Sequence, residues 1–381
     1  MRTDVRSQSE PHRKTGCDED VPSPWASLRP GAFSDISLNG ISVERVSSLC
    51  QAEEAWLGSF GFCTAYAFPP ASDIWISVDD QGRVSKCCYY VEQRWLGALK
   101  KLHIFGPTNL TEYEVQLLLA EKQAALACIT CMGPNDVSKW SGSWYRFAST
   151  AVNEDFILEL PRSEEAYLRS LGSNARTQLP YYLRRVRKEW GDDCEVSVTD
   201  GLDISKDIIA ELVELNRTRI ERKGVAHLWH PQLLDQRWRL AQDCGLFCGI
   251  RHEGNLVAGT LSYLHRGEAY FVLIGHRAEY DRLRLGKLVL WLTIQQLIQR
   301  GFTHYHLLWG KSSYKVELGG RPHILSEITV FRRPWVALLW HLREIFEKTG
   351  HIGRRVARIP IEVMRRICAS ISCSPAADKG L

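Results

Sequence analysis

A glycine at the start of a long apolar stretch is the first place in the sequence that could do chemistry. The loop and the turn that follows contain six candidate residues: Arg282, Arg284, Leu285, Gly286, Lys287 and Leu288. A pyrophosphate group binds to outward-pointing backbone N–H groups at the positive end of a helix, and a glycine lets the backbone approach without a Cβ in the way. We therefore expect the amides of residues 285–288 and the basic side chains to bind such a group. The alternative is a glycine in an ordinary loop before a core helix.

A second set of residues could accept a proton from an attacking group. His304 and His306 alternate with Tyr305, so in a strand both face the same side, and imidazole titrates near neutral pH. Glu268 and His276 flank the preceding predicted strand and are further candidates for a general base. Each could instead be structural. No serine or cysteine stands in a recognisable order with a histidine and an acid, which favours direct transfer over a covalent intermediate.

The elements that must position these residues form one continuous unit. Three short apolar stretches separated by turn residues predict an antiparallel meander. A strongly apolar helix closed by Gly301 follows, and then a last strand that ends in Gly310. The predicted ranges are 245–251, 256–263 and 268–274 for the meander, 287–300 for the helix and 304–309 for the last strand.

Upstream of the meander the sequence predicts a strand and two helices. The strand is expected at 156–160, and the second helix, at 204–223, ends at Gly224. The helix between them, near 174–189, is basic, and its charges could form either a solvated face or a binding surface. Its basic residues are Arg176, Arg184, Arg185, Arg187 and Lys188.

The first half of the chain predicts a separate unit of strands and helices. A hairpin with a glycine-containing turn is expected across 72–91. A helix is expected at 111–127, because Thr111 can cap it and Glu114 stands three residues further on. Residues 1–32 are rich in proline, serine and charge, and we expect them to be disordered.

Composition narrows the class of protein. The 381 residues are enough for two ordinary domains, and 45% hydrophobic with 24% charged residues is typical of a globular protein. The N-terminal residues are charged throughout, which argues against a secretory signal, and no stretch is apolar enough to cross a bilayer. We therefore expect a cytoplasmic protein whose 12 cysteines stay reduced. Cys128 and Cys131 form the only Cys-x-x-Cys pair, without a second pair at zinc-site spacing, so no metal is expected.

The order of these elements and motifs resembles the GNAT superfamily of acetyltransferases, and within it the CelD type associated with cellulose and polysaccharide biosynthesis. The resemblance covers most of residues 33–333. The motifs that carry it are the basic helix, then Arg219 with Lys223-Gly224, then Leu285-Gly286-Lys287, and Gly310 followed by Tyr314-Lys315. The sequence departs from relatives in two places. His306 and Leu307 replace an Asp-Phe pair in the last strand, and Leu288 stands where a second small residue is common.

The resemblance implies that acetyl-CoA or another acyl-CoA is the acyl donor and co-substrate, with its pyrophosphate at Gly286. Its thioester would lie between strands 268–274 and 304–309, which splay apart in the superfamily. Tyr314 matches the tyrosine that protonates the departing thiolate as general acid. Lys315 beside it could steady an acidic group or polarise the carbonyl. Either side chain could instead be ordinary structure.

The resemblance also implies a fold and a division of the chain. The fold class is α/β (α+β), with tandem GNAT-like units built from mixed, mostly antiparallel sheets flanked by helices. The expected parts are a disordered segment 1–32, a degenerate GNAT-like domain 33–150, an acyltransferase domain 151–333 and a basic helical tail 334–381. The first domain has no visible phosphate loop and would shape the acceptor cleft. The implied function is N- or O-acylation of an amine or hydroxyl on a small molecule or sugar, as in cell-envelope polysaccharide biosynthesis.

Two other classes remain open. FemABX transferases have tandem GNAT folds and take their acyl group from aminoacyl-tRNA, and the basic helix would then face RNA. The mild net charge of +4 does not by itself point to a nucleic-acid partner, which we do not expect. The second class is a catalytically degenerate acetyltransferase fold that serves as an assembly module, and His306 in place of aspartate favours it.

The segment beyond the predicted catalytic unit concentrates basic charge. Residues 332–366 contain nine Arg or Lys and three Glu, a net charge of +6 against +4 for the whole chain. Apolar residues at helical spacing with a flanking tryptophan, Trp335, suit the surface of an anionic membrane. We therefore expect peripheral membrane contact through residues 332–368, at the inner face of the membrane. The alternative is a first helix that packs on the domain, followed by a solvated tail.

Overall fold

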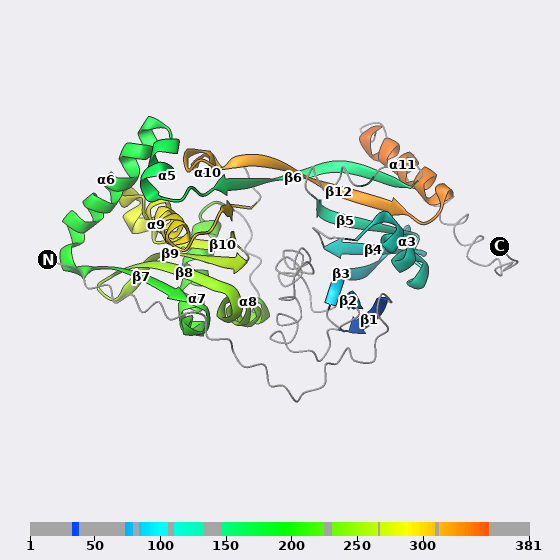
Figure 1. Cartoon of the computed structure of the whole chain (residues 1–381), viewed down its shortest axis with the longest axis horizontal. Helices are drawn as coiled ribbons and strands as arrows, with labels where there is room; N and C mark the ends of the chain where they lie inside the picture. The colour runs from blue at the N-terminus through cyan, green and yellow to red at the C-terminus, as the bar shows by residue number, and fades with distance from the viewer. Residues whose placement is uncertain are drawn as a thin grey trace, which may run out of the picture.

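One twelve-stranded sheet runs through the whole described part of the protein. Its strand order is β1-β2-β3-β4-β5-β12-β6-β11-β10-β9-β8-β7. Most neighbours are antiparallel, while β4–β5 and β10–β11 are parallel. Two units lie side by side and share the sheet (Figure 1). This mixed sheet flanked by helices confirms the predicted fold class. The computed structural model describes residues 33–37, 73–78, 84–105, 110–132, 140, 146–224, 231–265, 267–308 and 312–349.

The first unit contains five strands and one capped helix within the described ranges. The strands are β1 (Phe33–Ser37), β2 (Asp73–Val78), β3 (Val84–Trp95), β4 (Leu99–Phe105) and β5 (Leu126–Met132). β2 and β3 pair antiparallel, which confirms the predicted hairpin. Helix α3 (Glu112–Glu121) begins with the predicted capping box, in which the amide of Glu114 donates to Thr111 Oγ1 over 3.3 Å.

The predicted end of helix α3 at residue 127 is wrong. The helix stops at Glu121, and Gln123 takes a left-handed backbone with φ of 51°. Leu126 to Ile129 are then fully buried in β5, between β4 and β12. A short apolar segment buried on both faces of a sheet cannot be distinguished from a helix by periodicity alone.

The second unit contains the predicted meander. Its strands are β7 (Cys194–Asp200), β8 (Gly245–His252), β9 (Asn255–His265), β10 (Glu268–His276) and β11 (His304–His306). Its helices are α5 (Glu164–Ser170), α6 (Ser173–Trp190), α7 (Lys206–Glu221), α8 (Pro231–Cys244), α9 (Leu285–Gln299) and α10 (Ser313–Glu317). Short 3₁₀ turns η2 (Gly191–Asp193), η3 (Gly201–Asp203) and η4 (Ala278–Leu283) connect them. The meander β8–β10 and helices α6, α7 and α9 confirm the predictions, whereas β7 and α8 were not predicted.

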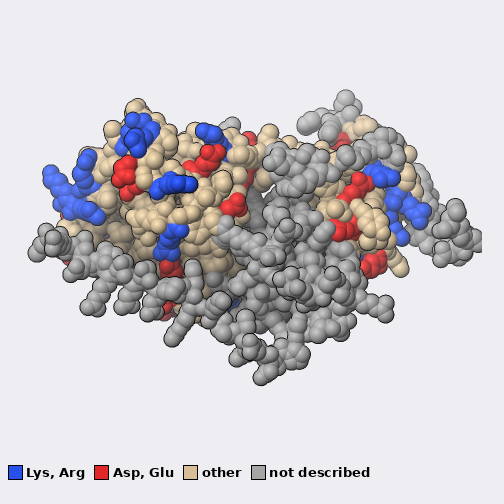
Figure 2. All heavy atoms as spheres, in the orientation of Figure 1, with Lys and Arg blue, Asp and Glu red and all other residues tan. Residues whose placement is uncertain are grey.

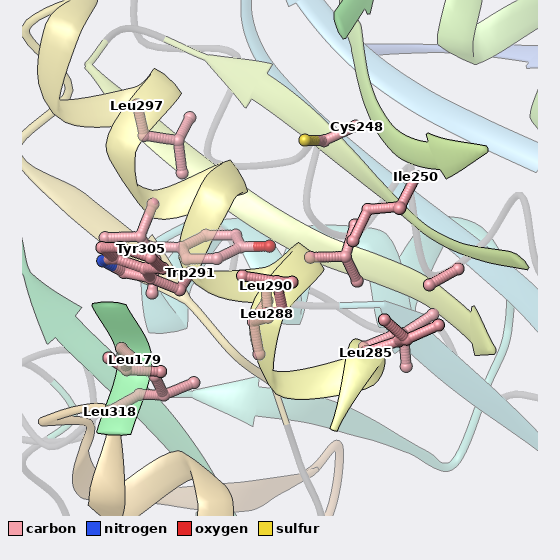
Figure 3. Close-up of a cluster of buried hydrophobic side chains, with 14 of the residues drawn as sticks. Leu179, Cys248, Ile250, Leu285, Leu288, Leu290, Trp291, Leu297, Tyr305 and Leu318 are labelled. Atoms are coloured by element: carbon pink, nitrogen blue, oxygen red, sulfur yellow. The ribbon is translucent and has the colours of Figure 1, made fainter. Parts of the chain in front are cut away.

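Helix α9 is the centre of the core of the second unit. Nine of its fifteen residues are buried, which explains why its sequence is apolar on almost every side. Figure 3 shows Leu288, Trp291 and Leu297 of this helix in one cluster with Tyr305 of β11. The Tyr305 hydroxyl lies 2.8 Å from Ser262 Oγ, so its buried oxygen has a hydrogen-bond partner. The core therefore fixes the start of α9 against β10 and β11.

Two long strands, β6 (Phe147–Glu159) and β12 (Arg321–Phe331), join the units. Both run from one unit to the other (Figure 1). β12 pairs with β6 along most of its length and with β5 at its far end, while β6 also pairs with β11. The predicted boundary between residues 150 and 151 therefore falls inside β6. Moreover, the sheet of the first unit is completed by a strand that follows the second unit in the sequence.

Helix α11 (Pro334–Thr349) belongs to the first unit. α3 packs on one face of its sheet, and α11 packs on the other against Trp95, Leu126 and Phe331. The first part of the predicted basic tail is therefore core structure. The rest of that tail, and the segment 1–32 expected to be disordered, lie outside the described residues. None of the described helices is both long and apolar enough to span a membrane.

Candidate active site

The parallel strands β10 and β11 pair for only three residues and then separate. The register pairs Glu268 with His304 and Tyr270 with His306 at the two ends of this short ladder. Beyond it, β10 has a bulge between Phe271 and Leu273. The chain after β11 instead follows β6, where the Leu307 amide donates to the Phe156 carbonyl over 2.8 Å. The β10–β11 ladder therefore ends at Tyr270 and His306, in the region where the family resemblance implies that the strands splay.

A cationic cavity of about 320 Å³ lies beside the far end of β10. It is enclosed by the end of α7, the loop before α9 and the start of α10. Five basic residues and one acidic residue line it, so it suits an anionic ligand. The lining residues are Arg219, Arg222, Lys223, Ile274, His276, Asp281, Arg284, Leu285, Gly286, Lys287 and Tyr314. The cavity therefore brings four of the six predicted phosphate-binding residues together with Tyr314.

The backbone at the start of α9 leaves two N–H groups open. Arg284 has a left-handed backbone, with φ 56° and ψ 36°, which is uncommon for a residue with a side chain. The amides of Lys287 and Leu288 both donate to the Arg284 carbonyl, over 3.0 and 3.1 Å. Among the described residues, the amides of Leu285 and Gly286 donate to no protein acceptor. The predicted cradle of four amides is therefore reduced to two.

Gly286 lies directly over a histidine ring. A Cβ added at Gly286 would stand 3.1 Å from His276 Nδ1, so any side chain here crowds that ring. His276 Nε2 lies 3.3 Å from Asp281 Oδ1, and Arg222 donates to Asp281 Oδ2 over 3.2 Å. Burial lowers the pKa of His276, Arg219 and Arg222 lower it further, and Asp281 opposes them. The imidazole is therefore neutral near pH 7, and its buried Nδ1 has no hydrogen-bond partner among the residues that the structure describes.

Three of the predicted phosphate-binding residues have their side chains engaged by other parts of the protein. Arg282 points away from the cavity and forms a two-pronged ion pair with Glu189 of α6, with one contact of 2.6 Å. The Lys287 ammonium is paired with Glu317 of α10 at the rim of the cavity. The Leu288 side chain is fully buried in the core. Arg284 and Arg219, which have no ion-pair partner among the described residues, are the cations best placed to bind an anion.

Tyr314 closes the cavity from the side of α10. Its ring packs against the core of the second unit, and its lining position places it with Ile274 and His276 beside the separated part of β10. Burial raises the pKa of Tyr314, and the nearby Arg219 guanidinium partly opposes this rise. The phenol therefore carries its proton at neutral pH and can donate it.

A second cluster, formed by Asp155, Glu268 and His306, lies at the end of the β10–β11 ladder. His306 Nδ1 is 2.6 Å from Asp155 Oδ2, and its Nε2 is 3.6 Å from Glu268 Oε2. The ring stacks on Tyr270 with centroids 4.6 Å apart. His304 is more loosely placed, with its Nδ1 3.8 Å from Glu268. The cluster thus links β6, β10 and β11 where the strands separate.

Charge on this cluster argues against His306 or Glu268 as a base at neutral pH. Burial alone would lower the pKa of His306, but Asp155 and Glu268 outweigh it and raise the pKa to about 9. The interaction with His306 lowers the pKa of Glu268 to about 2, against the effect of burial and with help from Tyr270. At pH 7 His306 is therefore already protonated, and Glu268 holds a proton only very weakly.

Lys315, which follows Tyr314 on α10, also has a shifted pKa. Its side chain is buried, and its Nζ donates to the Leu308 carbonyl over 2.8 Å and lies 5.3 Å from the Phe156 ring centroid. Burial lowers the pKa of Lys315 to about 8, although Asp155 opposes the shift. A substantial neutral fraction is therefore present at mildly alkaline pH, which a general base requires.

Several residues of the site were not predicted from the sequence. Asp155 stands just before the predicted strand 156–160. Its carboxylate at the edge of an apolar strand is the feature of the sequence that could have indicated a site residue. Arg222 and Asp281 carry no motif. Asn216 is buried in α7 and donates to the Ile274 carbonyl over 2.6 Å, which fixes α7 to the separated part of β10.

A comparison with protein families finds a match within the second unit. Residues 173–316 match the family described as "Acetyltransferase (GNAT) domain". This range contains the meander, α9, the cationic cavity, Tyr314 and Lys315. This part of the second unit is therefore similar to GNAT acetyltransferase domains. Among curated proteins, none is similar enough in sequence to match this chain.

Solved structures share the fold across both units. FemX superposes with a TM-score of 0.55 at 9% identity, covering 80% of this chain and 99% of that one. L-PGS from Bacillus licheniformis has a TM-score of 0.53 at 11% identity, with 86% and 97% covered. A conserved protein of unknown function from Bacteroides thetaiotaomicron has a TM-score of 0.53 at 14% identity, with 78% and 99% covered. At such low identity the similarity shows the shared fold alone.

Proposed function

We propose that the second unit transfers an acyl group from acyl-CoA directly to an amine or hydroxyl acceptor. The observation that carries the proposal is the cationic cavity at the start of α9. There, Tyr314 lies with Arg219 and Arg284, which have no ion-pair partner in the described part of the chain, and with the amides of Leu285 and Gly286, which donate to no acceptor there. Phosphate groups bind at such helix starts, and the family match makes acyl-CoA the donor that fits.

The transfer needs one acid and one base, and α10 supplies a candidate for each. The acceptor atom attacks the thioester carbonyl, the C–S bond breaks, and the thiolate takes the proton of Tyr314. The attacking nitrogen or oxygen gives up its own proton to a base, and Lys315, with a pKa of about 8, is the candidate on α10. None of the residues lining the cavity is a serine or cysteine, which supports direct transfer.

The acceptor class rests on the resemblance to CelD-type acetyltransferases. On that basis we propose a sugar or small molecule of cell-envelope polysaccharide biosynthesis, acylated on the cytoplasmic side. The first unit, which has no phosphate loop in its sequence, would then form one wall of the acceptor cleft.

The proposal is tested by titrating the full-length protein with acetyl-CoA in a calorimeter. In Gly286→Glu, a Cβ crowds His276 and a carboxylate faces the phosphates, so we expect affinity to fall at least about tenfold, or about 1.4 kcal/mol. Gly172→Glu is the matched control, because a Cβ at Gly172 meets nothing within 4 Å. If a folded Gly286→Glu protein binds acetyl-CoA as tightly as the control, the assignment of the cavity is wrong.

One feature favours a second donor, aminoacyl-tRNA. Arg184, Arg187 and Lys188 are exposed on α6 and have no ion-pair partner among the described residues. They would suit a nucleic-acid backbone. Salt-dependent binding of tRNA that Arg184→Glu weakens, together with no binding of acetyl-CoA, would replace the first proposal with this one.

A further inference from the structure

A second, larger cavity lies on the first unit. It is formed by other elements than the cationic cavity beside β10. Its volume is about 890 Å³, and it lies between the start of β4, the end of α3 and the first turn of α11. Four basic residues line it against a single acid, Glu121. The basic lining residues are Lys100, Lys122, Arg332 and Arg333, and Pro334 and Trp335 from the first turn of α11 also line the cavity. We call this hollow the α11 cavity.

The positive charge of the α11 cavity is only partly balanced by the protein. Lys100 pairs with Glu92 at 3.0 Å, and Lys122 pairs with Glu121 at 3.3 Å. Neither Arg332 nor Arg333 has an ion-pair partner in the part of the chain that the structure describes. Arg332 is half-buried, and its backbone is fixed by a hydrogen bond from its amide to the Ala125 carbonyl. Two unpaired guanidinium groups at the mouth of a cavity suit a phosphate group.

Helix α11 also carries an exposed apolar ridge. Leu338, Leu342 and Ile345 are 50%, 38% and 56% exposed. Their spacing of four and then three residues puts them on one side of the helix. Val336 and Ala337 on the opposite side are fully buried against the sheet. The ridge therefore begins at Leu338, close to the first residues of α11 that line the α11 cavity, and continues along the helix away from it.

Positive charge is concentrated in the α11 cavity and in the sequence that follows α11. Figure 2 shows basic and acidic side chains next to each other on the first unit, at the right of the view, where Figure 1 places α11. The 32 residues that follow Thr349 in the sequence include six Arg or Lys and only two acids. Cationic groups beside an exposed apolar helix face complement a surface that offers phosphates above hydrocarbon.

We propose that this side of the first unit docks on an anionic phospholipid surface. A lipid phosphate binds to Arg332 and Arg333 in the α11 cavity, and Leu338, Leu342 and Ile345 insert at the boundary between headgroups and acyl chains. A soluble phosphate would use the cavity but would not contact the exposed leucines Leu338 and Leu342. The phospholipid accounts for both features at once, and this docking does not depend on the identity of the acyl donor.

Co-sedimentation of the full-length protein with vesicles tests the docking. We expect binding at low salt to phosphatidylcholine vesicles that contain phosphatidylglycerol, release as salt rises, and little binding to phosphatidylcholine alone. Leu338→Glu should abolish most binding. Since each basic residue near an anionic surface strengthens binding about fivefold, Arg332→Glu/Arg333→Glu should weaken it roughly twenty-fivefold or more.

The matched controls are variants with the same kinds of substitution at exposed residues of the second unit. Leu202 is an exposed leucine in η3, so Leu202→Glu repeats the apolar-to-acid change, and Arg184→Glu/Lys188→Glu repeats the charge reversal on α6. Both controls should keep vesicle binding close to that of the unchanged protein. Thermal unfolding and acetyl-CoA titration show whether each variant is still folded.

Three results would overturn the docking. Equal loss of vesicle binding in the controls would mean a general effect of charge, and no loss in either α11 variant would exclude this surface. Binding of inorganic phosphate that Arg332→Glu/Arg333→Glu removes, without any binding to vesicles, would make the α11 cavity a site for a soluble anion.

Discussion

Replacing Asp155 by asparagine tests whether His306 is a buried cation. In the native protein the pKa of His306 is about 9, against about 6.5 in an unfolded chain. The difference, roughly 2.5 units, corresponds to about 3 kcal/mol of stabilisation when the imidazole is charged. Asp155 is the hydrogen-bonded partner at 2.6 Å, while Glu268 is more exposed and 3.6 Å away. We therefore assign the larger part to Asp155 and expect Asp155→Asn to lose about 2 kcal/mol at pH 6.

The loss should depend on pH in a defined direction. Because the pKa of His306 is raised by folding, its stabilisation is complete below about pH 6.5 and disappears as the pH rises through about 9. The difference in unfolding free energy between the native protein and Asp155→Asn should therefore be largest at pH 6 and smallest near pH 10. Lys315 titrates in both proteins, so the comparison is made between them at each pH.

Urea denaturation at several pH values measures this difference, and NMR of the imidazole carbon protons gives the pKa of His306 directly. Glu268→Gln is the matched control, because it also removes one carboxylate but should cost less through its exposure and longer distance. A native His306 that titrates near 6.5, or a loss in Asp155→Asn that does not change with pH, would refute the assignment. His306 would then again be a candidate general base.

Three further substitutions test the remaining roles. Tyr314→Phe should slow turnover roughly 10²–10⁴-fold while the calorimetric affinity for acetyl-CoA stays the same, and normal turnover would remove Tyr314 as the acid. Lys315→Gln should abolish the rise of kcat/KM with pH around 8, and an unchanged profile would assign the base elsewhere. Asn216→Leu should cost about 1–3 kcal/mol in urea unfolding, because the buried Ile274 carbonyl loses its donor. No loss would mean that the carbonyl finds another partner.

Local sequence signals predicted the second unit well. Turn residues between short apolar stretches marked β8, β9 and β10, and Gly301, with φ of 78°, marked the end of α9. The capping box marked the start of α3. These signals come from residues within a few positions of one another, so they can be recognised without knowledge of the fold.

Most of the predictions that failed concern contacts between residues far apart in the sequence. β5 could not be distinguished from a continued helix because its burial depends on β12, about 200 positions later, as in the Cys128–Thr329 contact. The charge of His306 depends on Asp155, which lies 151 positions earlier. Two of the four predicted amides, those of Lys287 and Leu288, donate to the Arg284 carbonyl because α9 begins at Leu285, two residues before the predicted start. The sequence thus predicted which residue types would gather, but not the contacts that set their protonation.

The strand order also determines when the protein can finish folding during translation. β5 needs Ile328 and Val330 of β12 to complete the core of the first unit, although 195 residues or more separate these positions. At roughly 5–20 residues per second, the ribosome needs about 10–40 s to bridge that gap. For that interval β5 is an unpaired edge strand, open to pairing with another nascent chain. We therefore expect the first half of this protein to depend on chaperones until its last strand emerges.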